Sequence, residues 1–83
     1  MDESHVKKAM CFLHYAESYS EQYSKSQDED YKDEAIHYFA LSVAFWLEFR
    51  KYKDDDFLNK MSKRLIILRN YLDPGLALPG LPI

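Results

Sequence analysis

Three histidines, His5, His14 and His37, are the side chains in this sequence best suited to bind a metal or to move protons. A zinc site normally shows regular ligand spacing, as in an HExxH helix or in paired Cys and His residues. None of the three histidines follows such a pattern, although His14 and His37 fall on neighbouring predicted helices. We therefore expect partly exposed histidines without a metal, and a metal-dependent or hydrolytic enzyme using His14 and His37 is the third of our hypotheses.

Other residue types that serve catalysis or ligand binding also lack the required context. No serine lies in a nucleophile elbow, and both glycines fall in the C-terminal tail, so no glycine-rich loop can cradle a phosphate. The acidic stretches QDEDYKDE and KDDD lack the central glycine and the closing glutamate of an EF-hand calcium loop. We predict no enzyme, no metal and no cofactor, and we assign the acidic residues to helix capping and to solvent.

Cys11 is the single cysteine, so the chain cannot form an intrachain disulfide. It is surrounded in the sequence by apolar residues, which predicts a buried structural thiol. A lone cysteine fits a reducing compartment, and the first residues show no basic segment leading into an apolar one, as a signal peptide would. These features predict an intracellular protein, cytoplasmic or nuclear.

Length and charge limit the function further. A chain of 83 residues has room for one domain, and its net charge of −3, with no basic face, argues against direct binding to nucleic acid. The longest apolar stretch, 39–47, is about half the length needed to cross a bilayer, so we predict no transmembrane segment. Seven Tyr, five Phe and one Trp suit a tight helical core or a protein interface.

Hydrophobic spacing predicts helices over residues 4–24, 31–52 and 57–72, with no strand alternation. The polar stretch 24–30 is predicted to be a loop or a frayed helix end. Apolar stripes run along the first helix (Val6, Met10, Leu13, Ala16) and the third (Leu58, Met61, Leu65, Leu68, Leu72). Three side chains are candidate N-caps: Ser4, Asp30 and Asp56. Proline and glycine in residues 73–75 end the third helix.

The second predicted helix is apolar around most of its circumference. Its stripes are Ala35–Phe39–Trp46–Phe49, Ile36–Ala40–Val43–Leu47 and Tyr38–Leu41–Phe45–Tyr52. Such a helix is buried on several sides, so it must contact two other elements, or one element and a partner. We predict an all-α fold, an antiparallel three-helix bundle over residues 1–73 with the second helix between the other two.

Residues 74–83 form a separate apolar tail, PGLALPGLPI. Its prolines favour an extended polyproline-like conformation, and leucines such as Leu78 and Leu81 flank them. Such a peptide suits a hydrophobic groove. The tail could dock on its own bundle, on a neighbour or on another domain of a longer protein, or it could be a disordered end.

Two helices resemble those of microtubule-interacting and trafficking (MIT) domains. DYKDEAIHYFALSVAFWLEFRKY is similar to their second helix, in which an aromatic residue and an acidic pair precede an alanine, here Tyr31, Asp33, Glu34 and Ala35, followed by Tyr38 and Ala40. FLNKMSKRLIILRNYL resembles their third helix, which alternates Leu/Ile with Lys/Arg. The resemblance implies an adaptor that binds short Leu/Pro-rich segments in the groove between helices 1 and 3, and LALPGLPI resembles such a ligand.

A second resemblance is to the helical C-terminal homology domain of AFF-type transcription elongation scaffolds. Those domains also run from a helix through a tyrosine-rich helix to a leucine-rich helix, and they dimerise through helical surfaces. This resemblance implies a homodimer in which the surplus aromatic residues of the second helix are buried between chains.

From these patterns we predict a non-catalytic protein-interaction module, whose partner is a protein or peptide: a helix or a short Leu/Pro-rich segment. The alternative is a dimerisation or docking domain of a nuclear scaffold. The expected contact residues are Lys60, Arg64, Ile67 and Tyr71 on the third helix, with Leu78 and Leu81 in the tail. The cations Lys60, Lys63, Arg64 and Arg69 are expected to steer an acidic partner.

Overall fold

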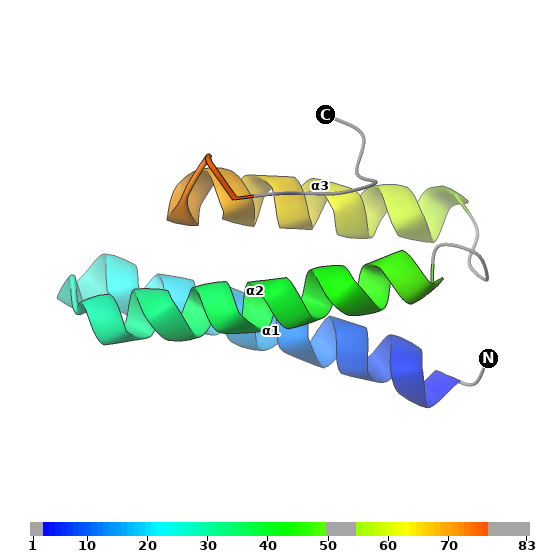
Figure 1. The fold of residues 1–83 in the computed structure, drawn as a ribbon, viewed down its shortest axis with the longest axis horizontal. Helices are drawn as coiled ribbons and strands as arrows, with labels where there is room; N and C mark the ends of the chain where they lie inside the picture. Colours follow the sequence, from blue (N-terminus) through cyan, green and yellow to red (C-terminus); the bar gives the residue numbers. More distant parts are fainter. Residues whose placement is uncertain (1–2, 50–54, 77–83) are drawn as a thin grey trace.

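The computed structural model describes residues 3–49 and 55–76, which form three helices and contain no strand. These are α1 (Glu3–Ser26), α2 (Glu29–Phe49) and α3 (Asp55–Leu72). Each helix runs opposite to the one before it, so α1 and α3 point the same way (Figure 1). The predicted all-α antiparallel three-helix bundle is confirmed, and the predictions for tail residues 77–83 lie outside the described residues.

A loop or a frayed helix end is predicted over 24–30, and the connection between α1 and α2 does lie there, but it is only Gln27 and Asp28. The backbone N–H of Gln27 donates to the Tyr23 carbonyl at 2.7 Å, which closes the last turn of α1. The carboxylate of Asp28 accepts from the backbone N–H of Asp30 at 3.0 Å. Asp28, and not Asp30, therefore caps α2. The polar residues on either side continue the helices because caps satisfy their terminal backbone groups.

Gln27 has φ of 58°, in the left-handed region that side chains with a Cβ disfavour. Its amide Nε2 donates to the carbonyls of Tyr23 and Ser24 at 3.4 and 3.2 Å, but both bonds are exposed. We expect Gln27→Gly to raise the free energy of unfolding by about 0.5–1 kcal/mol, since glycine adopts this conformation without strain.

The measurement is the midpoint of urea unfolding. Gln22→Gly is the matched control, because Gln22 is exposed inside α1 and its replacement should lower stability by about 1 kcal/mol. Equal effects of the two substitutions would contradict this account of the turn.

The starts of α1 and α3 also differ from the predicted ones. α1 begins at Glu3 and α3 at Asp55, so Ser4 and Asp56 lie inside their helices and are not N-caps. Acidic residues in the first turn favour the positive end of the helix dipole, and this extends both helices toward the N-terminus. The carboxylate of Asp56 instead pairs with Lys60 one turn later, at 3.1 Å.

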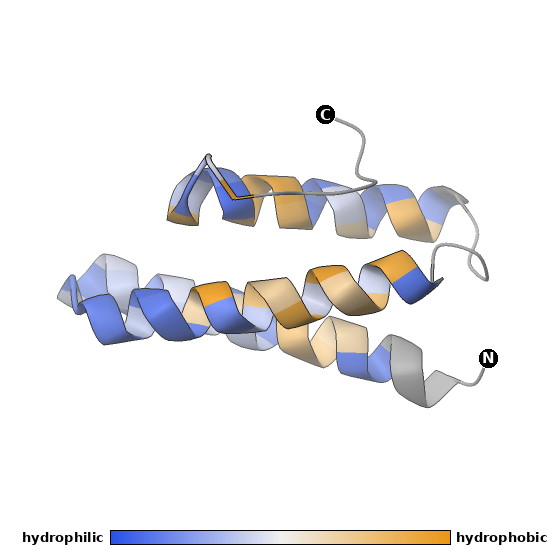
Figure 2. Ribbon diagram, in the orientation of Figure 1, coloured by the Kyte–Doolittle hydropathy of each residue, from blue (hydrophilic) through white to orange (hydrophobic). Residues whose placement is uncertain are grey.

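The core is one cluster drawn from all three helices. Three alanines, Ala9, Ala16 and Ala35, are fully buried, which lets the backbones of α1 and α2 approach closely. The larger buried side chains are Leu13, Phe39, Val43, Trp46, Met61, Leu65, Leu68 and Leu72. This set includes most of the stripe predicted for the third helix, and Figure 2 shows hydrophobic residues along the side of α3 that faces α2.

Aromatic side chains line the α1–α2 interface, where the two helices approach more closely than any other pair in the described part of the chain. The ring of Tyr38 in α2 lies 6.0, 5.3 and 5.7 Å from the rings of Phe12, Tyr15 and Tyr19 in α1. Phe45 lies 5.4 Å from Phe12. Such ring pairs stabilise an interface beyond the area that they bury. Much of the apolar surface of α2 is therefore covered by α1 within the same chain.

The contacts of α3 are fewer, although it touches both other helices. It packs through its leucine stripe and leaves a strip of surface open between itself and α1. In the described part of the chain, no helix is both long enough and apolar enough to span a bilayer.

Candidate partner-binding groove

A groove runs between the parallel helices α1 and α3. Three adjoining cavities of about 430, 530 and 310 Å³ make it up, and Arg64 lines all three. Its walls carry Met10, Cys11, His14, Tyr15 and Glu17 from α1, and Phe57, Lys60, Met61, Lys63, Arg64, Ile67, Leu68 and Tyr71 from α3. The surface lining each cavity is largely apolar.

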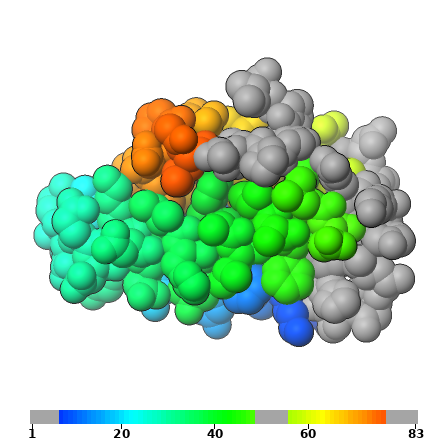
Figure 3. Space-filling view, viewed as in Figure 1, coloured from blue at the N-terminus to red at the C-terminus, as the bar shows by residue number. Residues whose placement is uncertain are grey.

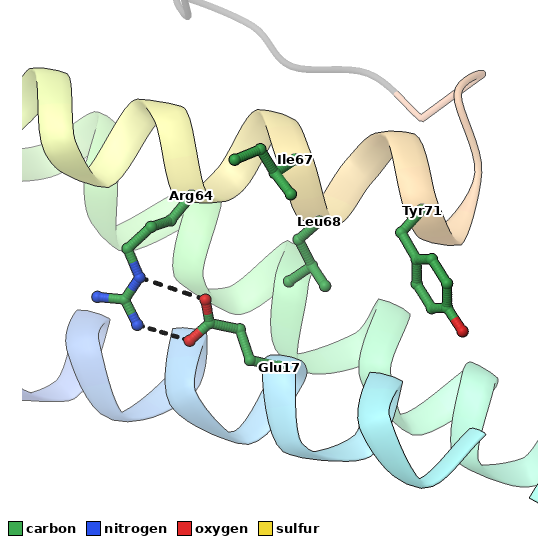
Figure 4. A pocket seen from close by; sticks show the side chains of 5 residues that line it. All are labelled: Glu17, Arg64, Ile67, Leu68 and Tyr71. Carbon is green, nitrogen blue, oxygen red and sulfur yellow. Dashed lines mark hydrogen bonds and ion pairs between the residues drawn. The ribbon is translucent and has the colours of Figure 1, made fainter. Parts of the chain in front are cut away.

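An ion pair between Glu17 and Arg64 crosses the groove. The two guanidinium nitrogens Nη2 and Nε donate to the two carboxylate oxygens at 2.5 and 3.2 Å (Figure 4). This two-point geometry fixes both side chains, which are each about two-fifths exposed. The pair therefore divides the groove into a Tyr71 end and a Phe57 end.

The Glu17–Arg64 pair is expected to contribute modestly to stability, because partly exposed pairs are screened by solvent. A double-mutant cycle with Glu17→Gln and Arg64→Met should give a coupling of about 0.5–1 kcal/mol. The coupling free energy is measured by urea unfolding of the four proteins at low and at high salt, and we expect it to be smaller at high salt. The exposed pair Glu21–Lys25 is the control, and a larger coupling there would contradict this ranking.

Large hydrophobic side chains are exposed along this groove. Among the side chains that the structure describes, the large hydrophobic ones that are half or more exposed are Tyr15, Ile67 and Tyr71, with exposed fractions of 50%, 70% and 50%. Each of the three lines one of the cavities. Figure 4 shows Arg64, Ile67 and Tyr71 following one another along α3, with Arg64 paired to Glu17 at one end of the row. Exposed apolar surface gathered in one place is typical of binding sites, whereas single exposed residues are ordinary.

The Phe57 end of the groove combines an apolar floor with positive charge. Met10, Phe57 and Met61 line this cavity together with Lys60, Lys63 and the Glu17-paired Arg64, and no acidic residue is among the described side chains that line it. The nearby Asp56 pairs with Lys60, but both side chains are about three-quarters exposed, so solvent screens that pair. This end can accept apolar side chains and a carboxylate together.

The structure brings four of the predicted contact residues, Lys60, Arg64, Ile67 and Tyr71, into this one groove. Leu78 and Leu81 lie outside the described residues. The steering role predicted for Arg69 stays a prediction. Arg69 does not line the groove, and its Nη1 donates to the carbonyls of Pro74 and Leu76 at 3.1 and 3.4 Å.

Sequence reasoning missed the α1 wall of the groove. Met10, His14 and Glu17 follow helical spacing and form a second stripe beside the buried one. This spacing could have predicted the α1 wall, because a stripe of mixed polar and apolar residues beside a buried stripe lies at the edge of a helix interface.

The predicted burial of Cys11 is wrong, because the thiol is exposed. His14 and His37 are exposed, and each ring lies beside the tyrosine that follows it in the chain, Tyr15 or Tyr38, at 6.3 and 5.3 Å. Within residues 3–49 and 55–76, no three His, Cys, Asp or Glu side chains come close enough to hold a metal ion.

Comparisons of this chain with family models, with curated proteins and with solved structures find no match.

Proposed function

We propose that this chain is a non-catalytic protein-interaction module that binds a segment of another protein in the α1–α3 groove. The observation that carries the proposal is the exposure of Ile67 and Tyr71, which together line one cavity of this groove, with the exposed Tyr15 lining an adjoining cavity. Exposing them in water is unfavourable, and a partner that covers them gains the free energy of apolar burial. The tyrosines also keep polar tips at the rim, as is common at interfaces.

The charged side chains at one end of the groove indicate which kind of partner can bind there. The chain is acidic overall, yet Lys60 and Lys63 lie together at the Phe57 end of the groove, beside the Arg64 that Glu17 pairs. A segment with apolar side chains and one or two carboxylates complements that end, and its charge would raise the association rate at low salt. We propose such a segment, either a helix or a short extended stretch, as the occupant.

The resemblance to MIT domains supports a more specific proposal, an intracellular adaptor for trafficking or membrane-remodelling factors. It predicts a monomer and a dissociation constant on the order of 1 μM, or about −8 kcal/mol. The alternative, a dimerisation domain of a nuclear scaffold, predicts burial of α2 aromatic residues between chains. Tyr38 and Phe45 pack on α1 within one chain, which favours the adaptor. Sedimentation equilibrium distinguishes a monomer from a dimer.

The test is a selection of displayed random short peptides against the full chain, followed by titration of the selected peptides. We expect Ile67→Asp to lower the affinity of the selected peptides about tenfold or more, because a charge would then lie in the apolar part of the site. A tenfold change in affinity corresponds to only about 1.4 kcal/mol. Ile67 is exposed, so the substitution should leave the fold intact.

Ala44→Asp is the matched control, since Ala44 is exposed on α2 and the change in charge is the same. It should leave affinity unchanged, and circular dichroism should show equal helicity in both variants. Selected peptides that bind both variants as well as the unmodified chain would refute the groove as the binding site.

A further inference from the structure

The residues after α3 turn back and are fixed to the end of that helix. The Asp73 carboxylate accepts from the backbone N–H of Gly75 at 2.9 Å, and the Asp73 carbonyl accepts from Leu76 at 3.0 Å. Arg69 then donates to the carbonyls of Pro74 and Leu76. The side chain of Leu76 is half-buried and packs against the core. The tail therefore begins in a defined place.

That place is not the α1–α3 groove. At roughly 100° per residue, Arg69 lies about 140° around α3 from Arg64 and about 160° from Tyr71, both of which line the groove. Ile66 lies about 60° from Arg69 and is half-buried on the same flank. Arg69 thus holds the start of the tail on the opposite flank of α3, the one adjoining α2.

The matching flank of α2 is apolar. Tyr38 and Phe45 face α1. Ile36 comes two residues before Tyr38, and Leu47 comes two residues after Phe45. Each therefore lies about 160° around α2 from the residue that faces α1. Ile36 and Leu47 share one flank and are half-buried against the core, and Ala40 between them is exposed. Figure 3 shows α2 in the middle of one face of the molecule, with the C-terminal end of α3 beside it.

The length and composition of the tail fit this flank. Seven residues follow Leu76, and in an extended polyproline-like form they span about 20 Å. The eleven-residue interval from Ile36 to Leu47 is about 16 Å long. Because α2 and α3 are antiparallel (Figure 1), a chain that reversed direction after α3 would run parallel to α2, in the direction from Ile36 to Leu47. Residues 77–83 carry three large apolar side chains and no charged one.

We propose that residues 77–83 dock within the same molecule along the α2–α3 flank, over Ile36, Leu47 and Ile66. The docked tail covers apolar surface of α2 that α1 and α3 do not bury. It also keeps the α1–α3 groove free, so the tail and a partner protein do not compete. This inference goes beyond the proposed function and does not depend on it.

The test is nuclear magnetic resonance of the full chain with labelled Ile and Leu methyl groups. We expect nuclear Overhauser cross-peaks from Leu78, Leu81 and Ile83 to Ile36, Leu47 and Ile66. Cross-peaks to Ile67 or Tyr71 would place the tail in the groove and overturn the proposal. Cross-peaks that appear only between differently labelled copies of the chain would mean that the tail docks on a second molecule, and they would overturn the proposal. The absence of any cross-peak from the tail would overturn it as well.

A variant with Leu78→Asp and Leu81→Asp provides a second test of tail docking. It should lose these cross-peaks and shift the methyl signals of Ile36 and Leu47, while the Ile67 signal stays in place. Asn70→Asp, at an exposed position of α3, is the control and should keep every cross-peak. Unchanged Ile36 and Leu47 signals in the tail variant would contradict the proposal even if the bundle were fully folded.

Discussion

Replacing Leu65 with alanine should lower the free energy of unfolding by about 2–5 kcal/mol. Leu65 has no exposed surface and lies in the cluster that joins α3 to the other two helices. The substitution removes buried methyl groups and leaves a cavity that the surrounding side chains fill only in part. A domain of this size has a total stability of roughly 4–12 kcal/mol, so the loss is a large share of the total and should lower the urea midpoint of unfolding markedly.

Urea unfolding followed by circular dichroism measures the effect, and Ile67→Ala is the control. Ile67 lies two residues later on the same helix but is 70% exposed, so its truncation should change stability by no more than about 0.5 kcal/mol. If the two substitutions changed stability equally, the orientation of α3 described above would be wrong.

Ala16→Leu should destabilise the protein by about 1–3 kcal/mol, because it overfills the contact between α1 and α2. Ala16 is fully buried, and so are Ala9 and Ala35 at the same interface. The Ser20 hydroxyl donates to the Ala16 carbonyl at 2.9 Å, and the Ser42 hydroxyl donates across the interface to the Ala9 carbonyl at 3.2 Å. A larger side chain would force the helices apart and stretch the second of these bonds.

Ala44→Leu provides the comparison on α2, where Ala44 is exposed. It should leave the urea midpoint nearly unchanged. A neutral Ala16→Leu variant would mean that α1 and α2 lie further apart than the structure has them.

The three helices could be predicted because their apolar residues recur at helical spacing over long stretches. In α3 the stripe Met61, Leu65, Leu68 and Leu72 is buried as the spacing predicts. The helix ends were predicted less well, since several polar residues near each end can serve as caps. Asp28 and Asp30 are equally plausible from their types alone, and only the backbone geometry at Gln27 makes Asp28 the cap.

Cys11 illustrates why the composition of neighbouring residues predicts burial poorly in a helix. Met10 and Phe12 adjoin it in the chain, but adjacent residues of a helix point in directions about 100° apart. Leu13 points into the core, so Cys11, two residues earlier, faces away from it.

The groove was only half predictable, because it is formed by residues far apart in the chain. The positions of Arg64, Ile67 and Tyr71 on one face of α3 follow from their spacing. That Glu17 lies opposite Arg64 depends on how far α3 is shifted along α1, and no periodicity within a single helix reports that shift. The sequence also does not show that α1 pairs mainly with α2, which is what leaves the groove open.

The two-residue connection between α1 and α2 also has a kinetic consequence. Helices joined so closely meet after closure of a short loop, so most of their contacts are local and can form early in folding. The third helix approaches the other two less closely, so we expect it to be the element that detaches most readily under native conditions. One wall of the groove is then a cooperative unit of low local stability, which can adjust its position when another polypeptide binds.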